Sequence, residues 1–265
     1  MCILLVDGLN LIRRIYAGQP ETTEQLKIEA TATQSLRAIR KNLDLFRPSH
    51  AVLVMEYSRH NWRRKFLPTY KLDRPAMPAA LRHALPDIVS TIAEGGVYEV
   101  SADGYEADDV IATLARGVVS RRGQIIILST DRLMCQLLSP LLQVYDHFGK
   151  KMLDREFCLQ RYQVLPRNLV SYFALVGNHS IGVGGVTGVG PKTAARLIAE
   201  HGGLSRILDA ADQMSGRVGK VLRKGAGEAR VAQRLFTLRE DVRLGVNLHH
   251  FRLEKEDRHQ GGLKK

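Results

Sequence analysis

The sequence predicts an α/β protein in which a doubly wound, mostly parallel sheet is followed by a second, helical domain. Three apolar runs, Cys2–Val6, Ala51–Met55 and Gln124–Leu128, contain almost no polar alternation, which is typical of strands covered on both faces. Helical patterns lie between these runs, and such alternation favours a parallel sheet with helices on both sides. After about residue 159 no clear strand follows, and helical patterns are joined by glycine-rich turns.

The expected elements follow in order along the chain. Apolar residues at helical spacing indicate a helix over Glu24–Phe46, and an acidic first turn indicates a second helix over Ala107–Val119. The remaining elements are a strand at Val97–Val100 and helices at Asn168–Val176, Lys192–His201 and Gly219–Leu244. We therefore expect an α/β domain over residues 1–158, with a basic segment at about 58–80, a helical domain over 159–253 and a frayed polar tail over 254–265.

The composition favours a polyanionic partner. Lys and Arg total 39 against 27 Asp and Glu, which gives a formal net charge of +12, and such a surface attracts phosphates at long range. Charge alone leaves nucleic acid and an anionic membrane surface open. No apolar segment reaches the roughly 20 residues needed to span a bilayer. The N-terminus does not read as a signal peptide and the three cysteines form no close pair, so we expect a protein of the reducing cytoplasm without a disulfide framework or a Cys-rich zinc site.

Six acidic residues follow the predicted strands. Three of the apolar runs lead to an acid, and Val97–Val100 is followed closely by the Glu-Ala-Asp-Asp stretch; the six residues are Asp7, Glu56, Glu106, Asp108, Asp109 and Asp131. Ligands of a parallel sheet bind beyond the carboxyl ends of its strands, so we expect these acids to converge. Crowded carboxylates repel each other unless a cation sits among them, and Mg²⁺ or Mn²⁺ prefers oxygen ligands. The alternative for each acid is an ordinary turn residue, a helix cap or a solvated first turn.

A divalent cation at this edge of a basic protein indicates phosphodiester chemistry. The cation can lower the pKa of a water molecule and neutralise the charge that develops on a phosphate. Attack in line with the leaving 3′ oxygen would then cut the strand.

The segment Ser58–Pro78 combines cations with aromatic rings. Cations bind phosphates and aromatic faces stack on unpaired bases. Its basic residues are Arg59, His60, Arg63, Arg64, Lys65, Lys71 and Arg74, and its aromatic residues are Trp62, Phe66 and Tyr70. For Lys71 and Arg74 we favour contact with phosphate. For Trp62 and Phe66 we favour packing inward on a solvated helix over stacking on bases.

The glycine-rich stretch Gly184–Ala195 predicts a tight hairpin between two helices. It is not a Walker A loop, because Pro191 stands where the lysine should follow the second glycine and no strand precedes it. Gly188 and Gly190 let the backbone approach a ligand, and Pro191 suits a first helical turn. The helix N-terminus, with Lys192 and Thr193, would then grip a phosphate without reading sequence. A plain connection between two helices is the alternative.

Taken together, these motifs resemble the 5′-nuclease or flap endonuclease family over nearly the whole chain. The resemblance rests on VDGLNLIRR, WRRKFLPTYKLDRPAMP, EADD, the STD at Ser129–Asp131 and GVTGVGPKTA. It implies a PIN-like α/β nuclease domain with a basic arch, followed by a helix–three-turn–helix domain of the helix–hairpin–helix type. It also implies divalent-metal-dependent cleavage of 5′ flaps or branched DNA by a monomer.

The resemblance also assigns residues. The six acids match the family's metal-proximal positions, Asp108 most firmly as a Mg²⁺ ligand. Asp108, Lys71 and Arg74 would be catalytic, the last two from the arch. In the hairpin, backbone carbonyls would hold a K⁺ ion, and the following turn would bind DNA. The carbonyls are those of Leu175, Val176, Gly184, Val186 and Val189, and the DNA-binding residues are Gly188, Val189, Gly190, Pro191, Lys192 and Thr193.

The chain also departs from the family's pattern. Glu56 stands where Asp is common, and Gly184 stands where Pro is usual. Three acids of the family's second metal site are replaced by Leu133, Asn178 and Ile181. Two readings therefore remain beside the nuclease: a module that binds branched DNA with reduced or lost catalysis, and a PIN-type ribonuclease, which the helical domain argues against.

Overall fold

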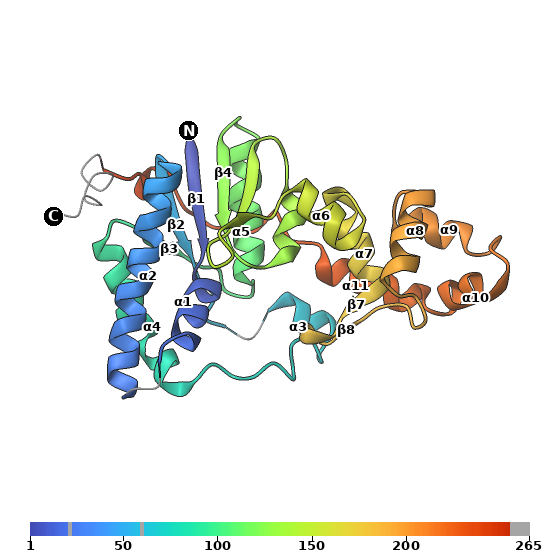
Figure 1. The fold of residues 1–265 in the computed structure, drawn as a ribbon, viewed down its shortest axis with the longest axis horizontal. Coiled ribbons are helices and arrows are strands. Elements are labelled where there is room, and N and C mark those ends of the chain that lie inside the picture. Colours follow the sequence, from blue (N-terminus) through green and yellow to red (C-terminus); the bar gives the residue numbers. More distant parts are fainter. Residues whose placement is uncertain (21–22, 59–60, 255–265) are drawn as a thin grey trace.

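A six-stranded sheet forms the centre of the first part of the protein (Figure 1). The computed structural model describes residues 1–20, 23–58 and 61–254. The strand order is β3-β2-β1-β4-β5-β6; the first five strands are parallel and β6 is antiparallel to β5. The strands are β1 (Cys2–Asp7), β2 (His50–Val54), β3 (Tyr98–Val100), β4 (Gln124–Leu128), β5 (Leu142–Asp146) and β6 (Lys151–Met152). The predicted α/β class is confirmed.

Helices cover both faces of this sheet, as its continuous apolar strands require. Leu4 and Val6 of β1 point into a core shared with α1 (Gly8–Ala17), α2 (Glu24–Phe46) and α4 (Ala79–Glu94). Ile3 and Leu5 of the same strand point into the opposite core, which is shared with α5 (Ala107–Val119). The alternation of β1 side chains therefore separates two apolar layers, and the sheet is doubly wound.

The second part of the protein is helical and extends away from the sheet (Figure 1). Helices α7 and α11 pack together, and α7 also packs on α8. The elements are α6 (Arg155–Tyr162), α7 (Leu169–Val176), the two-residue strands β7 (Gly177–Asn178) and β8 (Val183–Gly184), α8 (Pro191–His201), α9 (Leu204–Ala210), α10 (Gly216–Lys224) and α11 (Ala226–Phe236). The core beside α5 runs without a break into this region and reaches Leu175, Leu197 and Leu222.

Several elements differ from the sequence-based expectation. The predicted helix Gly219–Leu244 is wrong: α10 ends at Lys224, α11 ends at Phe236, and residues 237–247 form neither helix nor strand. Two glycines, Gly225 and Gly227, weaken helix propensity at the break. Strands β5, β6, β7 and β8 were not expected, nor were α1, α4, α6 and α9, whereas the helix favoured for Trp62 and Phe66 is α3 (Trp62–Phe66). Across the described ranges, no helix has the length and apolarity to cross a membrane.

Candidate active site

Asp7 and Asp131 lie where the order of the strands reverses. Strand β1 pairs with β2 on one side and with β4 on the other, which makes the β1–β4 boundary the topological switch point. Asp7 ends β1, and its Oδ2 accepts a hydrogen bond of 2.7 Å from the Ser129 hydroxyl at the end of β4. Its Oδ1 accepts a 3.3 Å hydrogen bond from the Asn10 amide in α1. The two strands and α1 thus hold this carboxylate in place.

Asp108 joins these two acids from the first turn of α5. Burial raises the pKa of Asp108 well above its usual value, and the nearby charges of Asp131 and Asp7 raise it further. Burial likewise raises the pKa of Asp7 to about 7. The hydrogen bond from Ser129 lowers this pKa, and the charge of Asp131 raises it. The Asp131 amide donates at 3.0 Å to the same Ser129 hydroxyl that bonds to Asp7, and Asp108 and Asp131 line one groove, so the three acids lie close together. A cation among them would relieve their repulsion.

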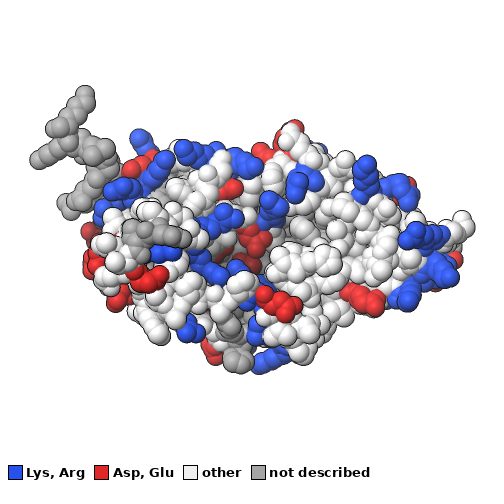
Figure 2. Space-filling model, turned by 60° about the horizontal axis from the view of Figure 1, so that its bottom comes forward, with Lys and Arg blue, Asp and Glu red and all other residues white. Residues whose placement is uncertain are grey.

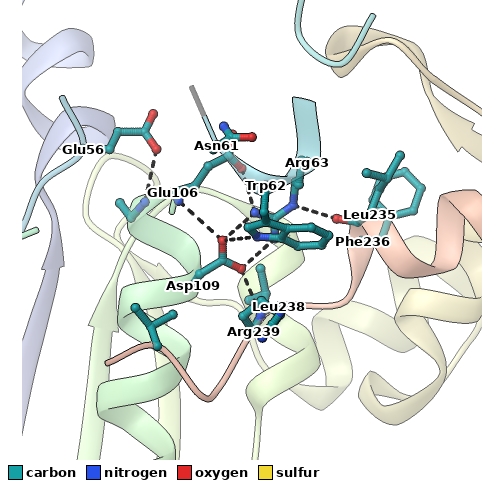
Figure 3. Close-up of polar contacts among 12 residues, drawn as sticks. Glu56, Asn61, Trp62, Arg63, Glu106, Asp109, Leu235, Phe236, Leu238 and Arg239 are labelled. Carbon is teal, nitrogen blue, oxygen red and sulfur yellow. Dashed lines mark hydrogen bonds and ion pairs between the residues drawn. The ribbon is translucent and has the colours of Figure 1, made fainter. Parts of the chain in front are cut away.

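Glu56 lies two residues beyond the end of β2, the strand that pairs with β1. Its Oε2 accepts a 3.1 Å hydrogen bond from the backbone amide of Ala107, which places it against the N-terminus of α5 (Figure 3). Burial raises the pKa of Glu56, the charge of Lys71 opposes that rise and the charge of Glu106 adds to it. Glu56 therefore faces the same edge as the other acids.

Glu106 already receives donors from the basic segment. Its Oε1 accepts from Lys71 Nζ at 2.8 Å and from Asn61 Nδ2 at 3.1 Å. Its Oε2 accepts from the Tyr70 hydroxyl at 2.9 Å and from Arg63 Nη1 at 3.2 Å. Burial alone would lower the pKa of Lys71, but the nearby charges of Glu106, Tyr70, Asp108 and Glu56 together outweigh burial and raise it. Lys71 is thus held as a cation beside the acids.

Asp109 is directed toward Arg63, Trp62 and Arg239 (Figure 3). Its two oxygens form a forked ion pair with Arg63, at 2.6 Å from Nη1 to Oδ2 and at 2.8 Å from Nη2 to Oδ1. The Trp62 indole donates to Oδ2 at 3.0 Å and the Arg239 amide to Oδ1 at 2.9 Å. Because its oxygens are taken up by these donors and it is fully buried, we remove Asp109 from the predicted metal-binding set.

The donor set fits a cation that retains other ligands. Within residues 1–20, 23–58 and 61–254, no three His, Cys, Asp or Glu side chains stand arranged to hold an ion by themselves. Mg²⁺ usually keeps several waters and is bound by one or two carboxylates together with substrate phosphates. Asp108 and Asp131, with Asp7 behind them, provide carboxylates of that kind.

Two of the acids lie in an open groove of about 810 Å³, and Glu56 and Glu106 line a neighbouring pocket that shares Lys71 and Arg74 with it. Asp108 and Asp131 line the groove together with Lys71, Arg74 and the turn over residues 177–181. Figure 2 shows acidic side chains deep in a hollow with Lys and Arg around it. The groove is also lined by Leu133, Asn178 and Ile181. The three positions that lack the family's acids therefore face the same groove as Asp108 and Asp131.

The basic segment divides between the surface and the interior. Arg63 is 1% exposed and is not available to a phosphate, whereas Arg74 is exposed at the groove. Phe66 is 38% exposed beneath the guanidinium of Arg234, so the expectation that it packs inward is wrong. Trp62 is half-buried, with its indole bonded to Asp109. Arg59 and His60 lie outside the described residues.

The glycine-rich hairpin packs backbone against backbone. The Val186 amide donates to the Leu175 carbonyl at 2.8 Å, and the Val189 amide donates to the Val186 carbonyl at 2.9 Å. A Cβ at Gly185 would lie 2.4 Å from the Leu175 oxygen and 2.4 Å from the Val176 carbonyl carbon, so only glycine fits there. The segments that carry the five carbonyls predicted to hold K⁺ thus lie in contact.

The turn beyond this contact leads into α8. Gly188 has a φ of 90°, which requires glycine, and Gly190 caps α8 in an extended conformation. Pro191 is the first helical residue, as expected, and Lys192 is exposed beside it. The free amides of this helix N-terminus and Lys192 are therefore accessible to an anion.

Two family models match the chain in succession. The model described as "5'-3' exonuclease, N-terminal resolvase-like domain" matches residues 2–163, and "5'-3' exonuclease, C-terminal SAM fold" matches residues 164–259. The chain belongs to the 5′-3′ exonuclease family. It is thus a nuclease, as the resemblance predicted.

Relatives of this 5′-3′ exonuclease match over almost their whole length. Flap endonuclease Xni of Aeromonas hydrophila is 38% identical over 253 residues, which covers 94% of this chain and 95% of that protein. Flap endonuclease Xni of Shewanella pealeana is 37% identical over 255 residues, which covers 96% and 98% respectively. The predicted resemblance to flap endonucleases is confirmed.

Solved structures share the fold at low identity. The 5′-exonuclease of T5 with bound zinc superposes with a TM-score of 0.78 at 18% identity, and 89% of each chain is covered. The T5 D15 flap endonuclease in a pseudo-enzyme-product complex with DNA and metal ions gives 0.71 at 16% identity, covering 89% of this chain and 88% of that one.

Sequence reasoning missed several residues of this exonuclease site. Ser129 directly follows the apolar run Gln124–Leu128, two residues before Asp131. Its place at the carboxyl end of that strand was the signal that its hydroxyl could bond to Asp7. Asn10 accepts from the Thr130 amide at 3.2 Å and lines the groove. No sequence signal links Arg63 to Leu235, whose carbonyl accepts its Nε at 2.9 Å.

Proposed function

We propose that this nuclease cleaves DNA at 5′ flaps or other branched structures and depends on Mg²⁺ or Mn²⁺. One observation carries the proposal: Asp108 and Asp131 line one groove with Lys71 and Arg74, and Asp7 is joined to Asp131 through hydrogen bonds to Ser129. Curated relatives named flap endonuclease Xni, and the T5 structure described with DNA and metal ions, support the choice of substrate and cofactor.

The residues of the groove would divide the work. Asp108 and Asp131 would hold the cation, with Asp7 adding charge from behind. When bound, the cation would neutralise the scissile phosphate and lower the pKa of a water molecule. Arg74 would contact the phosphate, and Lys71, held at 2.8 Å from Glu106, would stand ready to do the same.

The hairpin would hold the DNA at a distance from the cutting edge. We propose that the carbonyls of Leu175, Val176, Gly184, Val186 and Val189 bind K⁺, and that the start of α8 contacts the phosphate backbone. Two observations support this assignment: the segments that carry these carbonyls are in contact, and Lys192 is exposed. Such contacts position DNA without reading its sequence. We also propose that one copy of the chain is sufficient for activity.

A labelled 5′-flap substrate tests the proposal. Wild type should cut it when Mg²⁺ or Mn²⁺ is added, chelation should stop the reaction, and Asp108→Ala should be inactive while still binding the flap. Exchange of K⁺ for Na⁺ should weaken binding without changing the dependence on Mg²⁺. Wild type that binds the flap and cuts no branched DNA would instead favour a binding module, the reading motivated by Leu133, Asn178 and Ile181 in the groove.

A further inference from the structure

Arg63 joins three parts of the chain that are far apart in sequence (Figure 3). It lies in α3 of the basic segment and pairs with Asp109 of α5 through both terminal nitrogens, at 2.6 and 2.8 Å. Its Nε donates to the carbonyl of Leu235 near the end of α11, at 2.9 Å. The same side chain therefore links the basic segment, to which it belongs, with α5 and with the helical domain.

The contact extends from Arg63 to Lys71 through one carboxylate. Arg63 Nη1 lies 3.2 Å from Oε2 of Glu106, and Lys71 Nζ lies 2.8 Å from Oε1 of the same residue. The Tyr70 hydroxyl bonds to Oε2 as well. A change at Arg63 would free one side of Glu106, and the position of Lys71 in the groove would change with it.

We infer that Arg63 is a positioning residue for the cleavage reaction: through Asp109, Glu106 and Leu235 it fixes Lys71 and the base of the arch relative to the acids and the helical domain. The inference rests on the proposed function. It assigns Asp109 to the arch and not to the metal.

The geometry requires a guanidinium. Three nitrogens of Arg63 bond to three different groups at once, and a lysine ammonium, which is a point charge on a flexible stem, cannot reproduce this fork. A buried ion pair is also weak evidence for stability, because apolar side chains of similar volume often replace it without loss. The cluster is therefore better explained as a contact that holds α3, α5 and α11 in one relative arrangement than as a source of stability.

The chain contains a probe for this junction. Trp62 is its one tryptophan. The indole donates to Asp109 at 3.0 Å, and the Arg63 guanidinium lies 4.5 Å from the centre of the ring. Emission and quenching of Trp62 therefore report the junction without any cleavage assay.

The test compares Arg63→Lys and Asp109→Asn with Arg116→Lys, a control on α5 whose side chain is 63% exposed. We expect both junction variants to shift Trp62 emission and to slow single-turnover cleavage of a saturating 5′ flap about 10-fold to 100-fold, the cost of small misplacements. We expect the flap Kd to stay within about 3-fold, because phosphate contacts elsewhere supply most of the affinity. The Mg²⁺ concentration for half-maximal rate should not change, and Arg116→Lys should match wild type throughout.

The outcomes separate this inference from the proposed function. Wild type that cuts no branched DNA refutes both. A folded Arg63→Lys that cuts as fast as wild type refutes the inference alone, as does a large rise in the Mg²⁺ requirement of Asp109→Asn, which would make that residue a metal ligand. If Arg63→Lys does not fold, Asp109→Asn carries the test. If both unfold, the junction is structural and the inference is overturned.

Discussion

Alanine in place of Gly185 should destabilise the protein by forcing apart two backbone segments. A Cβ at this position would lie 2.4 Å from the Leu175 oxygen, 2.4 Å from the Val176 carbonyl carbon and 2.5 Å from the Gly177 nitrogen. All three atoms belong to the backbone, so no side-chain rotation relieves the overlap. Favourable carbon contacts need about 3.5 Å or more, so the segments must separate by about 1 Å.

The structure places the energetic cost of Gly185→Ala at the upper end of the range that is usual for overpacking. Overpacking in a well-packed region typically costs about 1–3 kcal/mol, and backbone on one side of the hairpin must move against backbone on the other. We therefore expect a loss of about 3 kcal/mol in the free energy of unfolding. For a chain of this size that corresponds to a fall in Tm of about 6–12 °C. Duplex DNA should also bind more weakly, because the segments predicted to hold K⁺ would separate.

Gly184→Ala is the matched control at the neighbouring position. A Cβ there meets nothing within 4 Å, and the backbone is not in the left-handed region. We expect its stability to change by less than about 0.5 kcal/mol. Thermal unfolding followed by circular dichroism, with K⁺ present, compares the two variants. If Gly185→Ala melted at the temperature of Gly184→Ala, the close contact between residues 175–177 and 184–186 would be refuted.

Three further predictions address the acids and the hairpin. Asp108→Asn should raise the Tm of the metal-free protein, because it removes a buried acid whose ionisation is opposed by burial and by the charges of Asp131 and Asp7, and it should abolish cleavage; a lower Tm in calorimetry would contradict this. Since the pKa of Asp7 is raised to about 7, the stability of the metal-free protein should fall as pH rises from near 3.8 through 7. Mg²⁺ should therefore increase the Tm more at about pH 8 than at about pH 5.5, where protons compete with the cation for the acid. An equal increase in Tm at both pH values would refute the link between Mg²⁺ binding and the ionisation of Asp7. Lys192→Gln should reduce the slope of log K against log salt for duplex binding by about 1, and an unchanged slope would remove it from the interface.

The part of the site that lies at the ends of strands could be predicted from the sequence. Apolar runs identify parallel strands, and the carboxyl ends of such strands meet at one edge, so Asp7 and Asp131 could be placed together although they are far apart in the chain. The helices Glu24–Phe46 and Ala107–Val119 also have the predicted bounds, because clear periodicity and a capping residue or acidic turn define them.

Asp109 shows where this reasoning fails. It is next to Asp108 in the sequence, but successive residues of a helix point in directions about 100° apart, so the two carboxylates face different neighbours. Asp108 faces the acids, whereas Asp109 faces Arg63 and the Arg239 amide. The partners of Asp109 come from two remote segments whose approach depends on tertiary packing, and no local pattern encodes it.

The same remote contacts bear on how a nuclease can recognise structure without reading sequence. Phosphate contacts carry no sequence information, so discrimination must come from the distance between the place that holds the duplex and the place that cuts. That distance is fixed only if the helical domain cannot move relative to the sheet. Here one apolar core spans both, Gln136 donates to the Phe236 carbonyl at 3.0 Å, and Arg63 donates to the Leu235 carbonyl at 2.9 Å. The junction around α11 therefore sets the spacing between hairpin and acids, and its loosening should make the cut position less precise before it makes binding weaker.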